Sequence, residues 1–348
     1  MKRLLPIFAI LFIWACDSSS GGAGTSNVDS TAAMLDTLNP VEANAGNDSL
    51  SEYVRNNPFD VNGFINRAKF YLAQQNARYA AADAAMAMEL DSANPEVLLL
   101  WGDVHYVQNK TRVSRDTWKK CIQQNPDNIE CRLKLAELYL AIQNYRESTK
   151  LVNEVIELDP RNAVAYFIKA TNVRDLAGDT ALSLRYAQQA IEYDPDYFAA
   201  LDYAATMSIY LKNRVGVGYF QRMIELDPDN SATYYKKGMY HMEFDDYNEA
   251  IQAFTQATQL RPTDAESYFN LGYIHLELGL NREALAYFNA SIEARQVNHR
   301  AYYGRGFTYE KMGDLLRARE DYAQALAYNP GHYASRVGME RVEGLINR

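Results

Sequence analysis

Apolar and small residues recur along this chain with a period of 34 residues. Within each period the apolar positions lie three and four residues apart, as on two amphipathic helices joined by a polar turn. In residues 231–264, Tyr234, Gly238 and His241 share one face of the first predicted helix. A small residue stands at the expected helix crossing of every period: Ala68, Gly102, Ala136, Ala170, Ala205, Gly238, Gly272 and Gly306. The pattern predicts eight stacked helical pairs with one continuous core.

A helix-stopping residue closes most periods. Proline occupies this place at Pro126, Pro160, Pro195, Pro228, Pro262 and Pro330. Proline removes a backbone donor and disfavours helix at the preceding residue, so each second helix should end just before it. Two periods depart from the rule with Ser92 and Gln296, and two differ from 34 residues, by a gain before Pro195 and a loss before Pro228.

Over residues 61–332 these positions resemble the tetratricopeptide repeat. That family favours large or aromatic residues at positions four and eleven, small ones at eight, twenty and twenty-seven, and proline at thirty-two. Residues 299–332 supply them as Tyr302, Gly306, Tyr309, Ala318, Ala325 and Pro330. The resemblance implies an all-α fold, a right-handed α-solenoid of about eight helix-turn-helix units. The units are residues 61–94, 95–128, 129–162, 163–197, 198–230, 231–264, 265–298 and 299–332.

The ends of the array need polar caps. We expect short capping helices at residues 49–56 and 333–346, so that the solenoid domain covers residues 47–348.

One unit also departs from the family pattern inside the array. Arg132 stands at a fourth position that is normally apolar.

The N-terminus carries a second signal. Lys2 and Arg3 precede an apolar run over residues 4–15, which has the length of a signal-peptide core rather than of a membrane span. Ile13-Trp14-Ala15-Cys16 resembles a bacterial lipobox, which implies a signal peptide at residues 1–15 and a lipidated Cys16. The alternatives are an uncleaved anchor and an ordinary secretory signal in which Cys16 has no role.

Residues 16–46 are rich in Ser, Gly, Ala, Asn and Asp and cannot bury much apolar surface. They should act as a flexible tether spanning about 30 Å on average. We therefore expect the protein in the bacterial cell envelope, lipid-anchored at the outer rather than the inner membrane, and either periplasmic or surface-exposed.

Charge and motifs narrow the function. A net charge of -9 without a basic stripe argues against nucleic-acid binding. The sequence contains no phosphate-binding loop, nucleophile elbow or His-Glu-x-x-His motif, so we predict no enzyme, cofactor or metal site. His105, His241 and His275 share the eleventh position, where other units have tyrosine, and we interpret them as packing rings with a local partner for the ring nitrogen.

Cys121 and Cys131 lie ten residues apart, near an interface between units. The sequence leaves two states open. They are two buried thiols that fill space as apolar groups, or they form a disulfide, which an exported compartment permits.

The predicted functional surface is the concave face, which in this family is lined by positions two, five, nine, twelve and thirteen. Early units place acidic residues there: Glu96, Asp103, Glu130 and Glu137. Later units place aromatic residues and methionine: Phe167, Tyr210, Tyr235, Met239, Met242, Phe269, Tyr273, Tyr303 and Phe307. Part of this aromatic set could pack between helices instead of facing solvent. Exposed aromatic residues and methionine in a groove favour a peptide ligand, and the acidic stretch favours a ligand that is basic at one end.

The sequence therefore predicts a membrane-anchored, non-enzymatic adaptor or scaffold that binds a polypeptide partner in its concave groove. The alternative is a structural subunit of an envelope assembly or secretion complex that uses its convex face or ends. The partner and the oligomeric state are open.

Overall fold

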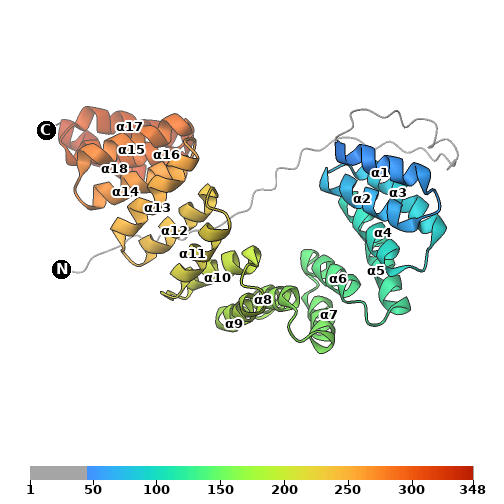
Figure 1. Ribbon diagram of the computed structural model, residues 1–348. Coiled ribbons are helices and arrows are strands. Elements are labelled where there is room, and N and C mark those ends of the chain that lie inside the picture. Colours follow the sequence, from blue (N-terminus) through green and yellow to red (C-terminus); the bar gives the residue numbers. More distant parts are fainter. Residues whose placement is uncertain (1–44, 348) are drawn as a thin grey trace.

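The computed structural model describes residues 45–347, which form eighteen helices and no strand (Figure 1). The helices are α1 Ala45–Asn56, α2 Val61–Ala73, α3 Ala77–Leu90, α4 Pro95–Val107, α5 Thr111–Gln124, α6 Ile129–Ala141, α7 Tyr145–Leu158, α8 Ala163–Ala177, α9 Thr180–Tyr193, α10 Phe198–Tyr210, α11 Gly216–Leu226, α12 Ser231–Glu243, α13 Tyr247–Leu260, α14 Ala265–Glu277, α15 Asn281–Ala294, α16 His299–Lys311, α17 Leu315–Tyr328 and α18 Tyr333–Ile346. The predicted signal peptide, Cys16 and most of the predicted tether lie outside the described residues.

Helices α2 to α17 pack as consecutive pairs, and each pair packs on the next. Every first helix begins at the first residue of a 34-residue unit because an Asn or Asp usually precedes it and caps it. The Asn128 side chain accepts a hydrogen bond of 2.8 Å from the backbone nitrogen of Cys131, and Asn94 accepts one of 2.9 Å from Glu96. The predicted all-α solenoid is confirmed.

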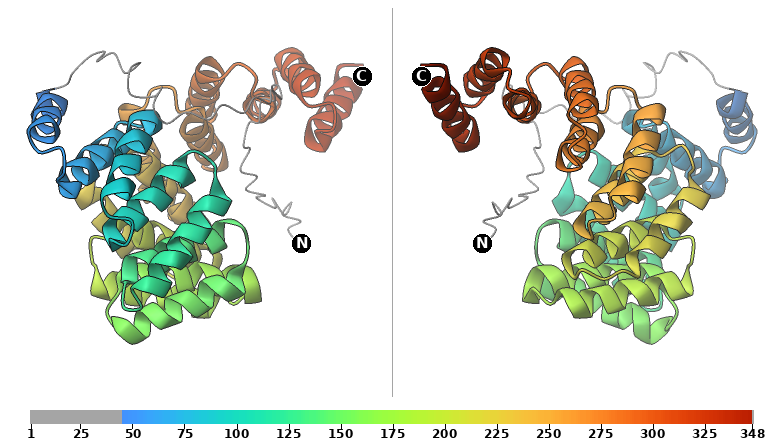
Figure 2. Two further views of the ribbon diagram at one scale, coloured as in Figure 1. Left: turned by 90° about the vertical axis from the view of Figure 1, so that its right-hand side faces the viewer. Right: turned by 90° about the vertical axis from the view of Figure 1, so that its left-hand side faces the viewer.

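The stack curves into an open arc with the first helices on its inner side (Figure 1). First helices also contact the first helices of neighbouring units, as α4 does with α2 and α6 and as α16 does with α14 and α18. Second helices make no comparable contacts with each other among the described residues. Closer packing on one side bends the array toward that side. A view turned by 90° shows the two ends offset from each other, so the arc is part of a superhelix and not a flat ring (Figure 2).

The residue at a helix crossing is smallest where a large side chain from another helix covers it. A Cβ atom on Gly272 would lie 2.8 Å from the Phe288 ring, and one on Gly304 would lie 2.6 Å from the same ring. Gly238 and Gly102 are covered in the same way by large rings of their second helices. Where the crossing residue is Ala136 or Ala170, the second helix carries aliphatic residues there instead. Units with glycine at the crossing thus keep their helices close by pairing it with a large ring.

The two changes in repeat length have local structural causes. Helix α8 has 15 residues instead of the 13 of other first helices, and it ends at Gly178 in the left-handed conformation, with φ of 67°. Helix α11 has 11 residues, against 14 in α13, and starts after a longer connection from α10. The array absorbs both changes without losing the pairing of its helices.

Both predicted capping helices are present. Helix α18 covers the predicted residues, and α1 begins at Ala45, four residues earlier than predicted. Arg132, which departs from the family pattern, is buried, and two contacts compensate its charge. Its Nε lies 3.2 Å from a Glu154 carboxylate oxygen, and its Nη1 donates to the Asn128 carbonyl at 3.0 Å. In the described part of the chain, no helix has the length and apolar character that a membrane crossing needs.

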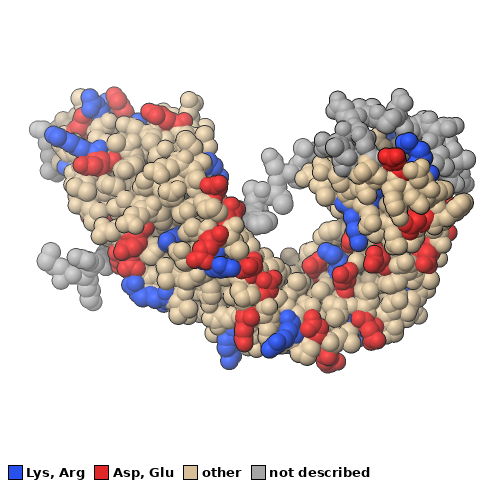
Figure 3. Space-filling view, viewed as in Figure 1, with Lys and Arg blue, Asp and Glu red and all other residues tan. Residues whose placement is uncertain are grey.

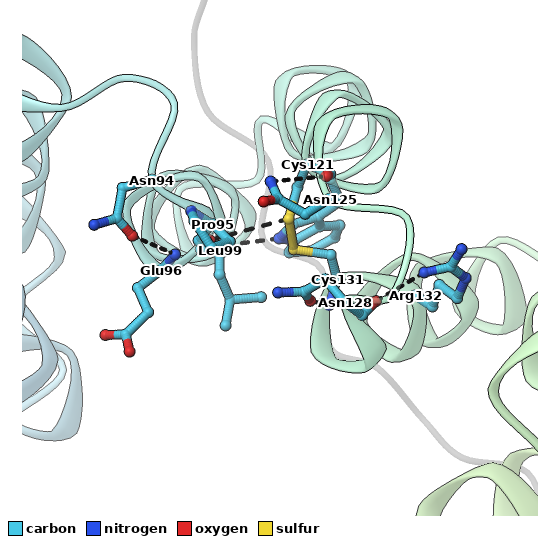
Figure 4. The surroundings of a disulfide bond; sticks show 10 residues. Asn94, Pro95, Glu96, Leu99, Cys121, Asn125, Asn128, Cys131 and Arg132 are labelled. Carbon is cyan, nitrogen blue, oxygen red and sulfur yellow. Dashed lines mark hydrogen bonds between the residues drawn. A yellow bond between two sulfur atoms is a disulfide. The ribbon is translucent and has the colours of Figure 1, made fainter. Parts of the chain in front are cut away.

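Cys121 and Cys131 form a disulfide that joins the end of α5 to the start of α6 (Figure 4). Both residues are fully buried. Asn125 donates to the Cys121 carbonyl at 3.3 Å, and Asn128 caps α6 at the Cys131 nitrogen. The sequence leaves open whether the two cysteines are thiols or a disulfide, and the structure has the disulfide.

Loss of this bridge should destabilise the array by about 2–4 kcal/mol, because the covalent link restricts the unfolded chain. The measurement is urea unfolding of the oxidised protein, of the protein with reductant, and of Cys121→Ser/Cys131→Ser. Reductant should lower the oxidised protein's midpoint to that of the double variant and leave the variant unchanged. Identical midpoints with and without reductant would show that the bridge does not contribute.

Candidate functional site

The predicted groove residues lie on the first helices, which form the concave side of the arc (Figure 1). Their exposure differs between the two halves of the groove. Glu96, Glu130 and Glu137 in the acidic half are exposed, and Asp103 is half-buried. On the face shown in Figure 3, the described Lys and Arg residues lie singly or beside acidic residues and form no continuous basic stripe.

A cavity of about 170 Å³ opens in the acidic half between α4 and α6. Its lining residues are Asp103, Tyr106, Val107, Trp118, Lys134, Glu137 and Leu138. Two of the predicted acidic residues, Asp103 and Glu137, therefore meet in one site. Trp118, from the second helix α5, is only 2% exposed, while the Tyr106 ring beside it is 42% exposed.

Asp103 is the electrostatic centre of this cavity. Burial raises the pKa of its carboxyl to about 6; Lys134 and Lys69 oppose this shift through their charge, while Glu137 and Glu130 reinforce it. Lys134 lies 3.2 Å from a Glu137 carboxylate oxygen. Burial lowers the pKa of Lys134, but the charges of Glu137, Asp103 and Glu130 outweigh it and the net shift is upward.

The acidic half meets the aromatic half at Glu137. Burial, followed by the charges of Glu137 and Asp194, raises the pKa of Tyr197 to about 12. The Tyr197 ring packs edge-on against Phe167, with ring centroids 5.3 Å apart. Glu137 is thus close enough to this aromatic pair for its charge to act on Tyr197.

In the aromatic half, Tyr210 is 62% exposed and Tyr273 is 36% exposed. The other predicted members are half-buried: Phe167, Tyr235, Met239, Met242, Phe269, Tyr303 and Phe307. Phe269 packs on Phe288 beneath it at 5.8 Å, for example. The aromatic surface open to a ligand is smaller than the sequence predicts, since most of these rings pack between helices.

Several residues of the site and its surroundings lie outside the positions that the sequence prediction used, namely Trp118, Lys134, Leu138 and Tyr197. Lys134 stands at a sixth position, outside the expected lining set, and its only sequence signal is the i,i+3 spacing to Glu137. Trp118 comes from a second helix, and Tyr197 comes from the turn before α10. A prediction restricted to the inner positions of first helices does not include them.

The three histidines at the eleventh position differ in their partners. Nδ1 of His105 lies 2.9 Å from the Trp101 carbonyl oxygen, and Nδ1 of His275 lies 2.8 Å from that of Leu271. His241 is different, because its buried Nδ1 has no hydrogen bond within residues 45–347 and lies 3.7 Å from Asp246. The nitrogen of His241 therefore has a local ionic neighbour, Asp246, but no hydrogen bond among the described residues. The described residues contain no group of three His, Cys, Asp or Glu side chains that could hold a metal ion.

Comparison with known proteins agrees with the repeat pattern. Tetratricopeptide repeat models match residues 118–170, 235–299 and 299–332. The human mitochondrial import receptor subunit TOM70 is 22% identical over 203 residues, which make up 55% of this chain and 33% of that protein. The chain therefore spans about a third of the length of this curated relative.

Two solved structures show the same fold. The C-terminal part of a repeat-containing protein from Cytophaga hutchinsonii matches with a TM-score of 0.58 at 14% identity, over 69% of this chain and 98% of that one. PilF from Pseudomonas aeruginosa matches with a TM-score of 0.51 at 14% identity, over 62% of this chain and 94% of that one. Repeats of this kind indicate a protein-interaction adaptor. The chain is a tetratricopeptide repeat protein.

Proposed function

We propose that this protein is a membrane-anchored, non-enzymatic adaptor that binds a segment of a polypeptide partner in its concave groove. The observation that carries the proposal is the composition of the inner face. Tyr210 and Tyr273 are exposed aromatic residues of its later units, and the carboxylates of Asp103 and Glu137 line a cavity in its early units. Exposed rings with polar neighbours are the usual anchors of peptide recognition.

Anchoring is the second part of the proposal. Two basic residues, an apolar run of signal-peptide length and Cys16 follow one another at the N-terminus, in the order that a lipobox requires. We propose a lipid on Cys16 and a location in the bacterial cell envelope, at the outer rather than the inner membrane. Mass spectrometry of the N-terminal peptide tests this, since an unmodified Cys16 would contradict it.

The groove is tested with the variant Tyr210→Ser/Tyr273→Ser. These rings are the exposed ones, so their removal should leave the fold intact, whereas half-buried Tyr235 and Phe307 also support packing. Truncation of anchor rings typically costs 1–4 kcal/mol of binding. We expect the partner that co-purifies with the anchored wild type from detergent extracts to decrease at least tenfold.

The matched control is Tyr333→Ser, which removes a 75% exposed ring from the C-terminal capping helix. This variant should retain the partner. Equal recovery with the wild type and both variants would contradict binding in the groove.

A specific observation also favours the alternative, a structural subunit that assembles through its outer surface. The connection between α10 and α11 and the first turn of α11 expose apolar side chains, with Val215 60% and Val217 41% exposed. The variant Val215→Ser/Val217→Ser should lose the partner if this edge is the contact. The same variant should retain the partner if the groove is the binding surface.

A further inference from the structure

We propose that the cavity between α4 and α6 receives one cationic side chain, of an arginine or a lysine, from the bound polypeptide. The inference rests on the proposed function, because it specifies the chemistry of one part of the same partner. At about 170 Å³ the cavity is smaller than a typical small-molecule pocket and suits a single side chain.

The charges around the cavity are unbalanced toward the negative. Asp103 and Glu137 line it, and the charge of Glu130 also acts on Asp103, which makes three carboxylates. Two cations oppose them, and each already has a partner: Lys134 pairs with Glu137 at 3.2 Å, and Lys69 pairs with Glu96 at 3.7 Å. Asp103 and Glu130 form no ion pair within residues 45–347. A ligand that neutralises this surplus must carry positive charge.

Asp103 contributes most to this preference. Its carboxylate accepts no hydrogen bond from the described residues, although it is half-buried. Burial therefore disfavours its charged form, so its pKa is raised. A cation placed beside the carboxylate would supply the missing partner and stabilise the charged form.

Aromatic rings provide the remaining wall of the cavity. Tyr106 and Trp118 lie side by side with ring centroids 6.0 Å apart, and Tyr106 is exposed. A guanidinium or ammonium group between these rings and the carboxylates would gain cation–π attraction as well as ion pairing. Neither an acidic nor a purely aliphatic side chain would gain both.

The test uses the full chain in detergent micelles and a library of ten-residue peptides. Each peptide is made twice, once with a single arginine and once with citrulline, its neutral analogue, and binding is measured by fluorescence anisotropy. Arginine peptides that bind should do so at least tenfold more tightly than their citrulline partners. Asp103→Asn should remove this difference.

A variant that strengthens binding shows that the result is not caused by misfolding. Lys134→Gln removes the internal cation, so arginine peptides should bind more tightly to it than to the wild type. Asp103→Asn should also raise the thermal midpoint, because it removes a carboxylate that burial destabilises. The carboxylates of Glu157 and Asp229 are exposed and have no ion-pair partner among the described residues, so Glu157→Gln and Asp229→Asn are the controls and should bind like the wild type.

The pH dependence is a further readout. Because a cation binds the ionised carboxylate, the arginine preference should be full at pH 7.5 and decrease as the pH falls through about 6. The charged groups facing Asp103 are Glu130, Lys134 and Glu137 on α6 and Lys69 on α2.

The outcomes separate the two proposals. Peptides that bind equally well with arginine and citrulline would overturn the cationic site and leave the groove function standing. If no peptide binds, both proposals fail.

Discussion

Replacement of Phe288 by alanine is expected to lower the free energy of unfolding by about 3–5 kcal/mol. The Phe288 ring is 1% exposed, and it fills the space between α14 and α16. Gly272 and Gly304 lie against it, and neither has a side chain that could move into the cavity left by the ring. The surrounding helices cannot move easily into this cavity, so the loss of unfolding free energy should lie near the upper end of that range.

Urea unfolding measures the loss, and hydrogen exchange locates it. Since each unit contacts only its neighbours, exchange should accelerate mainly in α14, α15 and α16. The matched control is Phe59→Ala, which removes a ring that is 85% exposed and should cost less than about 0.5 kcal/mol. A loss for Phe288→Ala as small as this control's would show that the ring does not hold the units together.

The second large effect is expected for Arg67→Ala, at about 3 kcal/mol. Arg67 forms two hydrogen bonds with Asp83, of 2.6 and 2.8 Å, and the Asp83 side chain is only 6% exposed. The variant leaves a buried carboxylate without a partner. The double variant Arg67→Met/Asp83→Leu removes both charges and should recover most of the lost stability.

This loss should depend on pH. Burial raises the pKa of Asp83, while Arg67 lowers it, so removal of Arg67 raises it further. A group with a raised folded-state pKa favours folding below its unfolded-state pKa and loses this contribution as the pH rises through the folded-state value. The deficit of Arg67→Ala should therefore be smaller near pH 4 than at pH 7.5. A deficit independent of pH would contradict the role of the Asp83 charge.

The fold could be predicted from the sequence because each unit repeats the same local requirements. Small residues such as Gly238 mark the crossings, and prolines such as Pro262 mark the helix ends. The matching of each crossing to the ring that covers it could not be predicted so directly. Gly304 contacts Phe288 of the preceding unit, and this contact depends on how the units stack.

The site could be predicted only in part. Asp103 and Glu137 lie 34 residues apart, so equivalent positions of stacked units bring them together as the repeat implies. The burial that raises the pKa of Asp103 depends on how neighbouring units pack, and a helical period does not reveal the depth of a side chain. For the same reason the sequence left open which rings of the groove are exposed, and the structure has Phe269 half-buried.

The central claim is that a polypeptide partner occupies the concave face, and crosslinking from single sites tests it most directly. A photoreactive amino acid is placed at Glu137 or Tyr273 on the inner side, and at Glu157 on α7 as the outer control. The full-length protein is irradiated in the cells that produce it. We predict a partner adduct from positions 137 and 273 and none from position 157. An adduct from position 157 alone would contradict the account.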